Sequence, residues 1–242
     1  MIVLQHNLYI AVSMFFTVRF LSFGVSAWWR EVWGWDRVKN VIKSLPGRLG
    51  FGRGNVLNFF RLRLDIDTGE VYDEVLERFL TERERYGLYY VLYTYAQAKE
   101  DIGELGELVT PSQICPAIHC PMTKENLEAI TKLTQSVFSL NPELLLKAAE
   151  PFNPQKVDIG DIAVKIYTLP RVPIVLAIWL GEESIPPSIS ILYDKSVTNY
   201  LDCESAMIMA GVLMARLIIS LAKKVGINVG DVKYSYRYQC PE

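Results

Sequence analysis

The clearest pattern of apolar and polar positions lies between residues 161 and 194, where three strand-like segments follow one another. Residues 161–169 and 188–194 alternate between apolar and polar side chains, which is typical of strands with one covered face. Residues 172–180, VPIVLAIWL, are apolar on both faces, so we expect a central strand covered on both sides. The links between these segments are short, and parallel neighbours would need a long crossover. The pattern therefore predicts an antiparallel meander over about 161–194.

A second, smaller set of strands is expected upstream. In FRLRLDI (60–66) apolar and polar residues alternate, and Asp67-Thr68-Gly69 has the composition of a tight turn. We therefore predict a hairpin over 57–72, with the apolar side chains of 60–66 on one face.

The remaining apolar positions recur at helical spacing. The last and longest of these segments, 202–226, is apolar nearly all round, which indicates a helix buried by protein. Asp202 or Ser205 is suited to cap its start and Gly226 its end. The fold class that follows is α+β, an antiparallel sheet packed against several helices with a long buried helix near the C-terminus. The other predicted helices cover 28–45, 74–100 (broken or bent near Gly87), 126–140 and 141–152.

The apolar segment 8–29 bears on domain organisation and compartment. It is long enough to cross a bilayer core of about 30 Å, but Arg19 near its centre opposes insertion by about 2.5–3.5 kcal/mol. The small residues 25–27 resemble a signal cleavage site, although no basic residue precedes the apolar run. We expect 1–27 to be an apolar extension or buried helix, with a membrane anchor through 8–29 as the alternative. Residues 28–242 are then a single α+β domain, and the cytoplasm is the expected compartment.

Composition and charge narrow the classes of partner. Half of the 242 residues are apolar and 21% are charged, which is the balance of a folded globular protein. The formal net charge is −2, whereas a broad nucleic-acid surface needs clustered lysine and arginine. We therefore expect no such surface.

One loop, TPSQICPAIHCPMT (110–123), holds side chains suited to metal binding. Cys115, His119 and Cys120 lie within six residues and would supply three ligands of a zinc or iron site, which then needs a fourth. Three other interpretations stay open: a Cys115–Cys120 disulfide, a reactive thiol, and two small buried side chains beside a helix start. The sequence contains no Cys-x-x-Cys pair, which favours the buried interpretation.

Polar residues collect where the three predicted strands end. Short polar loops at the ends of an apolar sheet are typical of a rigid scaffold that presents a binding site. In the alternative interpretation Arg171 pairs with Asp194 or with a carboxylate of a turn and fixes the edge of the sheet. The candidate residues for binding a ligand or partner are Arg171, Glu182, Glu183, Asp194, Ser196 and Asn199.

Residues 169–204 resemble the signature region of a prokaryotic family called domain of unknown function 3786. The likeness is specific over this segment and looser back to about residue 30. The chain departs from the family pattern at Asn199, where the family has histidine, and at Asp202-Cys203, where it has Pro-Thr. The matching positions are Leu169, Pro170, Arg171, Val172, Pro173, Trp179, Gly181, Glu183, Pro186, Pro187, Leu192, Asp194, Ser196, Tyr200, Leu201 and Glu204.

The resemblance implies a fold unit and candidate positions without a reaction or a cofactor. Some relatives are associated with iron–sulfur or one-carbon metabolism proteins. We therefore expect a non-catalytic binding or accessory module for a protein or small-molecule partner, serving a metalloenzyme or iron–sulfur system. The alternative is an enzyme in which Arg171 holds a small anionic substrate and Asp194 or Glu183 is the general base. The sequence contains no nucleophile elbow or P-loop to support the enzyme.

Overall fold

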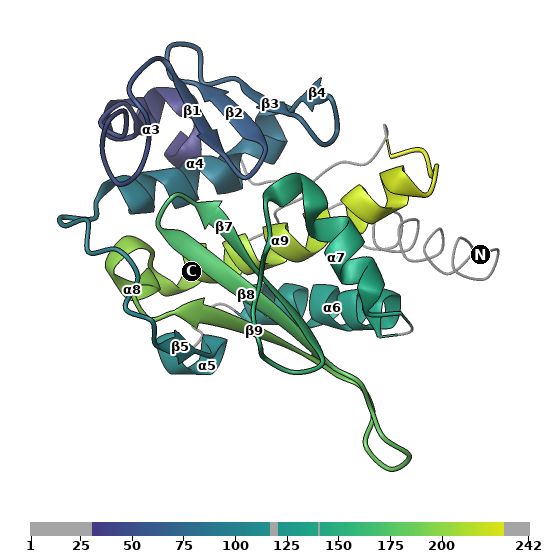
Figure 1. Cartoon of the computed structure of the whole chain (residues 1–242). Helices are drawn as coiled ribbons and strands as arrows, with labels where there is room; N and C mark the ends of the chain where they lie inside the picture. Colours follow the sequence, from purple (N-terminus) through teal and green to yellow (C-terminus); the bar gives the residue numbers. More distant parts are fainter. Residues whose placement is uncertain (1–30, 117–120, 140, 230–242) are drawn as a thin grey trace.

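The computed structural model describes residues 31–116, 121–139 and 141–229. These residues form two antiparallel sheets and a set of helices between and beside them (Figure 1), which confirms the predicted α+β class. The predictions for the segment 8–29 lie outside the described residues.

The smaller sheet has four strands in the order β1-β2-β3-β4. It contains the predicted hairpin, but the chain turns earlier than the alternation indicated. Phe60 and Arg61 both have positive φ and form a tight turn, so the strand predicted to run through them is broken in two. The second turn follows at the expected place, where the Asp65 carboxylate accepts the N–H groups of Asp67 and Thr68. The strands are β1 (Val56–Phe59), β2 (Leu62–Asp65), β3 (Val71–Asp73) and β4 (Arg78–Phe79).

Two helices pack beside this sheet. α3 (Trp35–Ile42) is shorter than the predicted helix over 28–45, because Gly34 is extended and separates it from the helical residues before it. α4 (Glu82–Ala96) runs through Gly87 without a break. Its start is fixed by a capping box between Thr81 and Glu84. The helix predicted over 74–100 therefore begins only at Glu82, and residues 74–81 are not helical.

The larger sheet has five strands in the order β5-β9-β8-β7-β6, and every neighbouring pair is antiparallel. The predicted meander is confirmed as β7-β8-β9. Both faces of β8 are buried: Ile174 and Leu176 face the main core, while Val175 and Ala177 lie on the other side. The strands are β5 (Leu108–Val109), β6 (Gln155–Lys156), β7 (Ile162–Leu169), β8 (Val172–Trp179) and β9 (Ser188–Asp194).

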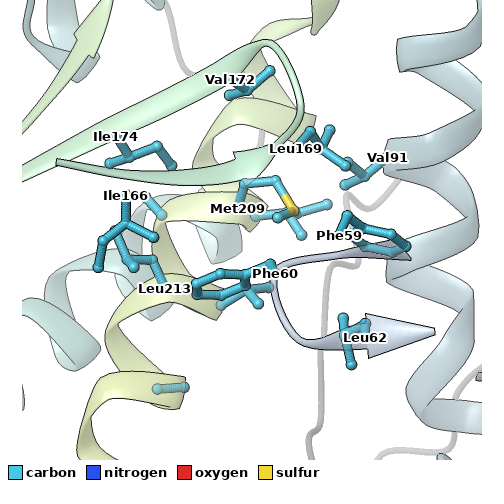
Figure 2. Packing of buried hydrophobic residues seen from close by; sticks show 14 of the residues in the cluster. Phe59, Phe60, Leu62, Val91, Ile166, Leu169, Val172, Ile174, Met209 and Leu213 are labelled. Carbon is cyan, nitrogen blue, oxygen red and sulfur yellow. The ribbon is translucent and has the colours of Figure 1, made fainter. Parts of the chain in front are cut away.

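A long helix, α9 (Cys203–Lys224), fills the space between the two sheets, with Met209 and Leu213 packed between Ile174 of the larger sheet and Phe60 of the smaller one (Figure 2). Its start is capped as predicted, since the Asp202 side chain accepts the Ser205 N–H at 2.8 Å. The helix is long and apolar enough to cross a membrane, but 94% of its most apolar 18-residue segment is buried inside the protein. The remaining helices are α5 (Pro111–Ile114), α6 (Pro121–Phe138), α7 (Glu143–Ala149), η1 (Glu150–Phe152) and α8 (Val197–Tyr200).

One charged side chain interrupts the apolar surface of α9. Arg216 is fully buried and pairs with the equally buried Asp73 of β3, with 2.5 Å between Nη1 and Oδ2. The rings of Phe60 and Phe152 lie 5.1 and 5.6 Å from its guanidinium carbon. The other Asp73 oxygen accepts backbone N–H groups of the following turn. This ion pair connects the smaller sheet to α9 at the centre of the protein.

Candidate functional site

The meander brings four of the six polar candidates together and leaves two apart. β8 and β9 are antiparallel, so Arg171 before β8 and Asp194 at the end of β9 lie at the same end of the sheet. Ser196 follows as the residue just before α8, and Asn199 lies in α8. Glu182 and Glu183 follow β8 at its other end, roughly 27 Å away along an eight-residue strand. The six residues do not share one rim.

The four residues at the first end surround a loop that we call the acidic loop (residues 100–107, EDIGELGE). Arg171 donates two hydrogen bonds to the carboxylate of Asp101, from Nε at 2.7 Å and from Nη2 at 2.9 Å. Arg171 is therefore paired with a carboxylate, as one interpretation expected, but the partner is Asp101 of this loop rather than Asp194. This hydrogen bonding lowers the pKa of Asp101 below its usual value.

Asp194 holds the middle of the acidic loop through the backbone. Its carboxylate accepts N–H groups from Leu105 at 2.9 Å, Gly106 at 2.7 Å and Ser196 at 2.9 Å. Burial alone would raise the pKa of Asp194, but the hydrogen bonds from Ser196, Leu105 and Gly106 outweigh it and lower the pKa. Asp194 is therefore a buried, ionised acceptor rather than a carboxylate with a raised pKa that suits a general base.

The end of α8 holds the beginning of the acidic loop. Asn199 donates its side-chain N–H to the Glu100 carbonyl at 3.0 Å. The Tyr200 hydroxyl donates to Asp101 at 3.1 Å and accepts the Gly103 N–H at 3.1 Å. The Tyr200 ring stacks on Tyr95, with 5.5 Å between the ring centroids. Tyr200 matches the family pattern, but sequence reasoning assigned it no role.

Two further carboxylates of the loop are paired with the sheet and the turn after it. Glu104 accepts from Lys165 of β7 at 2.5 Å and from the hydroxyl of Tyr167. Glu107 pairs with Lys195, with 3.0 Å between Nζ and Oε2. The sequence predicted no element between the helix over 74–100 and the cysteine-bearing segment 110–123, so this loop was missed. The spacing of acidic residues and glycines in the loop was the available signal.

Three apolar residues of this region are exposed beside carboxylates that are each paired with a basic residue. Ile102 is 39% exposed, Leu105 57% and Leu108, the first residue of β5, 41%. Gly103 and Gly106 separate them, and their φ values of 66° and 74° are the left-handed conformation that glycine adopts without strain. Ile102, Leu105 and Leu108 therefore form a small exposed apolar surface between paired carboxylates.

The two remaining candidates lie on the turn between β8 and β9, which projects away from the body of the protein (Figure 1). Glu182 pairs with Ile185 across this turn, and both glutamates are exposed. Gly181 has no room for a Cβ, which would lie 2.2 Å from the Ile185 carbonyl oxygen. Gln135 of α6 holds the turn through the Pro187 carbonyl at 2.6 Å.

The cysteine predictions need one correction. Cys115 forms a disulfide with Cys203, and not with Cys120 as one interpretation had it; the two Cα atoms are 5.5 Å apart. The reason is tertiary, since β5 pairs with β9 and so brings the end of α5 to the start of α9. His119 and Cys120 lie outside the described residues. Among the residues that the structure describes, no group of three histidine, cysteine or acidic side chains is placed to hold a metal ion.

The fold and this site define the class of protein. It is an α+β protein in which Arg171, Asp194 and Asn199 hold the acidic loop against the end of the larger sheet. Residues 43–216 match the family model described as domain of unknown function, DUF3786, and the chain belongs to this family. The matched segment contains both sheets, the acidic loop and every polar candidate. The comparisons with curated proteins and with solved structures found no match.

The lowered pKa values give a prediction for the acidic loop. Asp101 and Asp194 both have folded pKa values below the unfolded value of about 3.9, so their contribution to stability is fully present above that pH. It is lost as the pH falls from about 4 through the folded pKa. We expect hydrogen exchange of the Leu105 and Gly106 amides to keep a constant protection factor between pH 5 and 8 and to lose it below about 4. A loss of protection with a midpoint above pH 5 would contradict this account.

Proposed function

We propose that this protein is a non-catalytic binding module that docks a protein partner through Ile102, Leu105 and Leu108. One observation carries the proposal. Arg171, Asp194 and Asn199 all hydrogen-bond to the acidic loop, which exposes Ile102 and Leu105 directly before the exposed Leu108. The family resemblance adds the expectation that the partner belongs to a metalloenzyme or iron–sulfur system.

Rigidity of the loop supports docking. A flexible loop loses conformational entropy when it binds, and a loop already fixed in its bound shape avoids that cost. Here the N–H groups of Gly103, Leu105 and Gly106 and the carbonyl of Glu100 are all hydrogen-bonded to residues of α8 and the end of β9. The loop therefore presents its apolar side chains on a fixed backbone.

The outward apolar side chains point to a protein rather than a small anion. Single exposed apolar residues are ordinary on protein surfaces. In the acidic loop and the first residue of β5, however, three occur within seven residues at a spacing of three. The carboxylates of Asp101, Glu104 and Glu107 are already paired. An apolar surface of a partner would bury Ile102, Leu105 and Leu108 without leaving an unpaired charge beneath them.

The enzyme alternative has less support. It needs the Arg171 guanidinium for a substrate anion and a basic carboxylate at Asp194 or Glu183, but Glu183 lies at the other end of β8 from Arg171. Arg171 already makes a two-pronged bond to Asp101, which a substrate would have to displace, and Asp194 accepts three N–H groups. The lowered pKa of Asp194 further weakens it as a base at neutral pH.

Site-specific photo-crosslinking in the full chain tests the proposal. A photoreactive amino acid in place of Ile102 is expected to give a discrete crosslinked adduct in native cells, because this side chain would be covered by the partner. The same amino acid in place of Phe79, which is 58% exposed on β4, is the matched control and is expected to give no such adduct.

A second substitution shows whether the adduct depends on the apolar display. Leu105→Glu in the Ile102 crosslinking background is expected to reduce the adduct at least about tenfold, since a charge would be buried at the interface. Leu105 is exposed, so the melting temperature should stay close to that of the parent. An adduct unchanged by Leu105→Glu, or equal adducts at positions 102 and 79, would overturn docking through this loop.

A further inference from the structure

The Cys115–Cys203 disulfide joins the two segments that meet at the acidic loop. Cys115 is the C-cap of α5 and follows the acidic loop and β5 directly in the sequence. Cys203 is the first residue of α9, three residues after Tyr200, which hydrogen-bonds to the loop. The covalent link therefore closes the same pair of segments that the polar contacts of Asp194 and Asn199 hold together.

We propose that this disulfide is a redox-sensitive fastener of the acidic loop, and that its reduction releases the loop from its fixed conformation. That reduction regulates docking rests on the proposed function. That reduction releases the loop does not depend on it. The substrate of the redox step is a dithiol reductant or, in the reverse direction, an oxidised dithiol of the same class.

Residues 108–115, between the acidic loop and the disulfide, have few noncovalent attachments. β5 pairs with β9 through two residue pairs only, Leu108 with Asp194 and Val109 with Tyr193. α5 is a single turn, and its capping box is internal to the turn. The ion pairs of Asp101 and Glu107 are partly exposed, and such pairs contribute little to stability. The disulfide is therefore the strongest link between residues 108–115 and the rest of the protein.

The two sulfur atoms differ in their access to a reductant. Cys115 is buried, whereas Cys203 is partly exposed. Cys203 also lies at the first position of a 22-residue helix, where the helix dipole stabilises a thiolate. Its exposure makes the Cys203 sulfur the accessible point of attack, whereas the helix dipole stabilises the Cys203 thiolate that is released when the mixed disulfide breaks.

The exchange is balanced in electrons and protons. A thiolate of the dithiol attacks the Cys203 sulfur, the sulfur–sulfur bond breaks, and Cys115 leaves as a thiolate that takes up a proton. The second thiol of the reductant then loses its proton, attacks the mixed disulfide and releases Cys203 as a thiolate, which takes up a proton. The protein gains two electrons and two protons, and the dithiol becomes a disulfide.

Release follows from chain entropy. With the disulfide intact, an opened acidic loop is tethered near both ends, by α4 on one side and by Cys115 on the other. Without it, the open state has many more conformations, while the hydrogen bonds that close it are unchanged. The population in which the Leu105 and Gly106 N–H groups are free of Asp194 therefore increases.

Hydrogen–deuterium exchange of the full chain tests this directly, with and without excess dithiothreitol. Alkylation and mass analysis confirm that both Cys115 and Cys203 become free thiols. We expect the peptide covering residues 100–110 to exchange about tenfold faster or more on reduction, as a local opening does. The peptide covering 172–179 of β8 should remain protected over the same minutes, because both faces of that strand are buried.

Two variants separate the fastener from other effects. Cys203→Ser without reductant should reproduce the faster exchange of 100–110. Cys120→Ser, which leaves both bonded cysteines in place, should exchange like the parent. Unchanged exchange of 100–110 after complete reduction would overturn the proposal, as would free Cys115 in the oxidised protein or simultaneous loss of protection in 172–179. None of these readouts involves a partner, so a missing adduct at position 102 would overturn docking alone.

Discussion

Arg216→Leu is expected to destabilise the protein by about 3–5 kcal/mol, the largest effect of any single substitution considered. The reason is the partner left behind: the Asp73 carboxylate is fully buried and would lose the guanidinium that pairs with it. Leucine fills only part of the space between the Phe60 and Phe152 rings. The free energy of unfolding from urea titration measures the loss.

A rescue variant and a surface control define this result. Asp73→Asn added to Arg216→Leu removes the unpaired charge and keeps an oxygen for the N–H groups of Val75 and Leu76, so part of the stability should return. Lys39→Ala breaks the exposed pair with Asp36 and should cost less than about 1 kcal/mol. A loss below about 1 kcal/mol for Arg216→Leu would show that the buried pair does not hold the smaller sheet to α9.

Asp194→Ala is the second large effect, and it acts on the acidic loop. Three backbone N–H groups lose a charged acceptor, and hydrogen bonds to charged groups contribute about 1.5–3 kcal/mol each. Leu105 and Gly106 lie on the surface and can turn to water, so we expect a net loss of about 2–4 kcal/mol. Urea titration gives the free energy of unfolding, and hydrogen exchange of residues 100–110 shows whether the loop opens.

The isosteric variant Asp194→Asn refines this prediction. One carboxylate oxygen accepts from both Leu105 and Ser196, and the other from Gly106. An amide keeps one oxygen, retains two of these bonds and places an N–H group against the Gly106 N–H. We expect about half the loss seen with alanine. Equal stability of the aspartate, asparagine and alanine forms would remove Asp194 as the residue that fixes the loop.

The match between sequence and structure depends on how local each signal is. The alternation in 161–169 and the unbroken apolar run of 172–180 predicted β7 and β8, because the face of a strand is decided by neighbouring residues alone. The cap at Asp202 was likewise readable, since it acts within one helical turn. The prediction of one continuous strand through Phe60-Arg61 was wrong. A tight turn lies there, with Phe60 packed against Phe152, and alternation of apolar and polar residues does not reveal it.

The candidate site was predicted only in part. Arg171, Asp194, Ser196 and Asn199 were identified from their positions at strand ends, and the meander itself places Glu182 and Glu183 at the opposite end. The loop that these residues hold was not predicted. Its Asp101 lies 70 residues before Arg171, and no local pattern connects two groups so far apart in the chain.

The sequence by itself thus determined the elements whose cause is local: the covered strand Val172–Trp179, its two neighbours, and the apolar helix Cys203–Lys224 with its cap. The tertiary structure alone decided that Arg171 binds Asp101, that Cys115 joins Cys203, and that Arg216 meets Asp73. Each of these pairs spans at least 70 residues, so its energy is gained only once both sheets have packed on α9 and brought the partners within bonding distance.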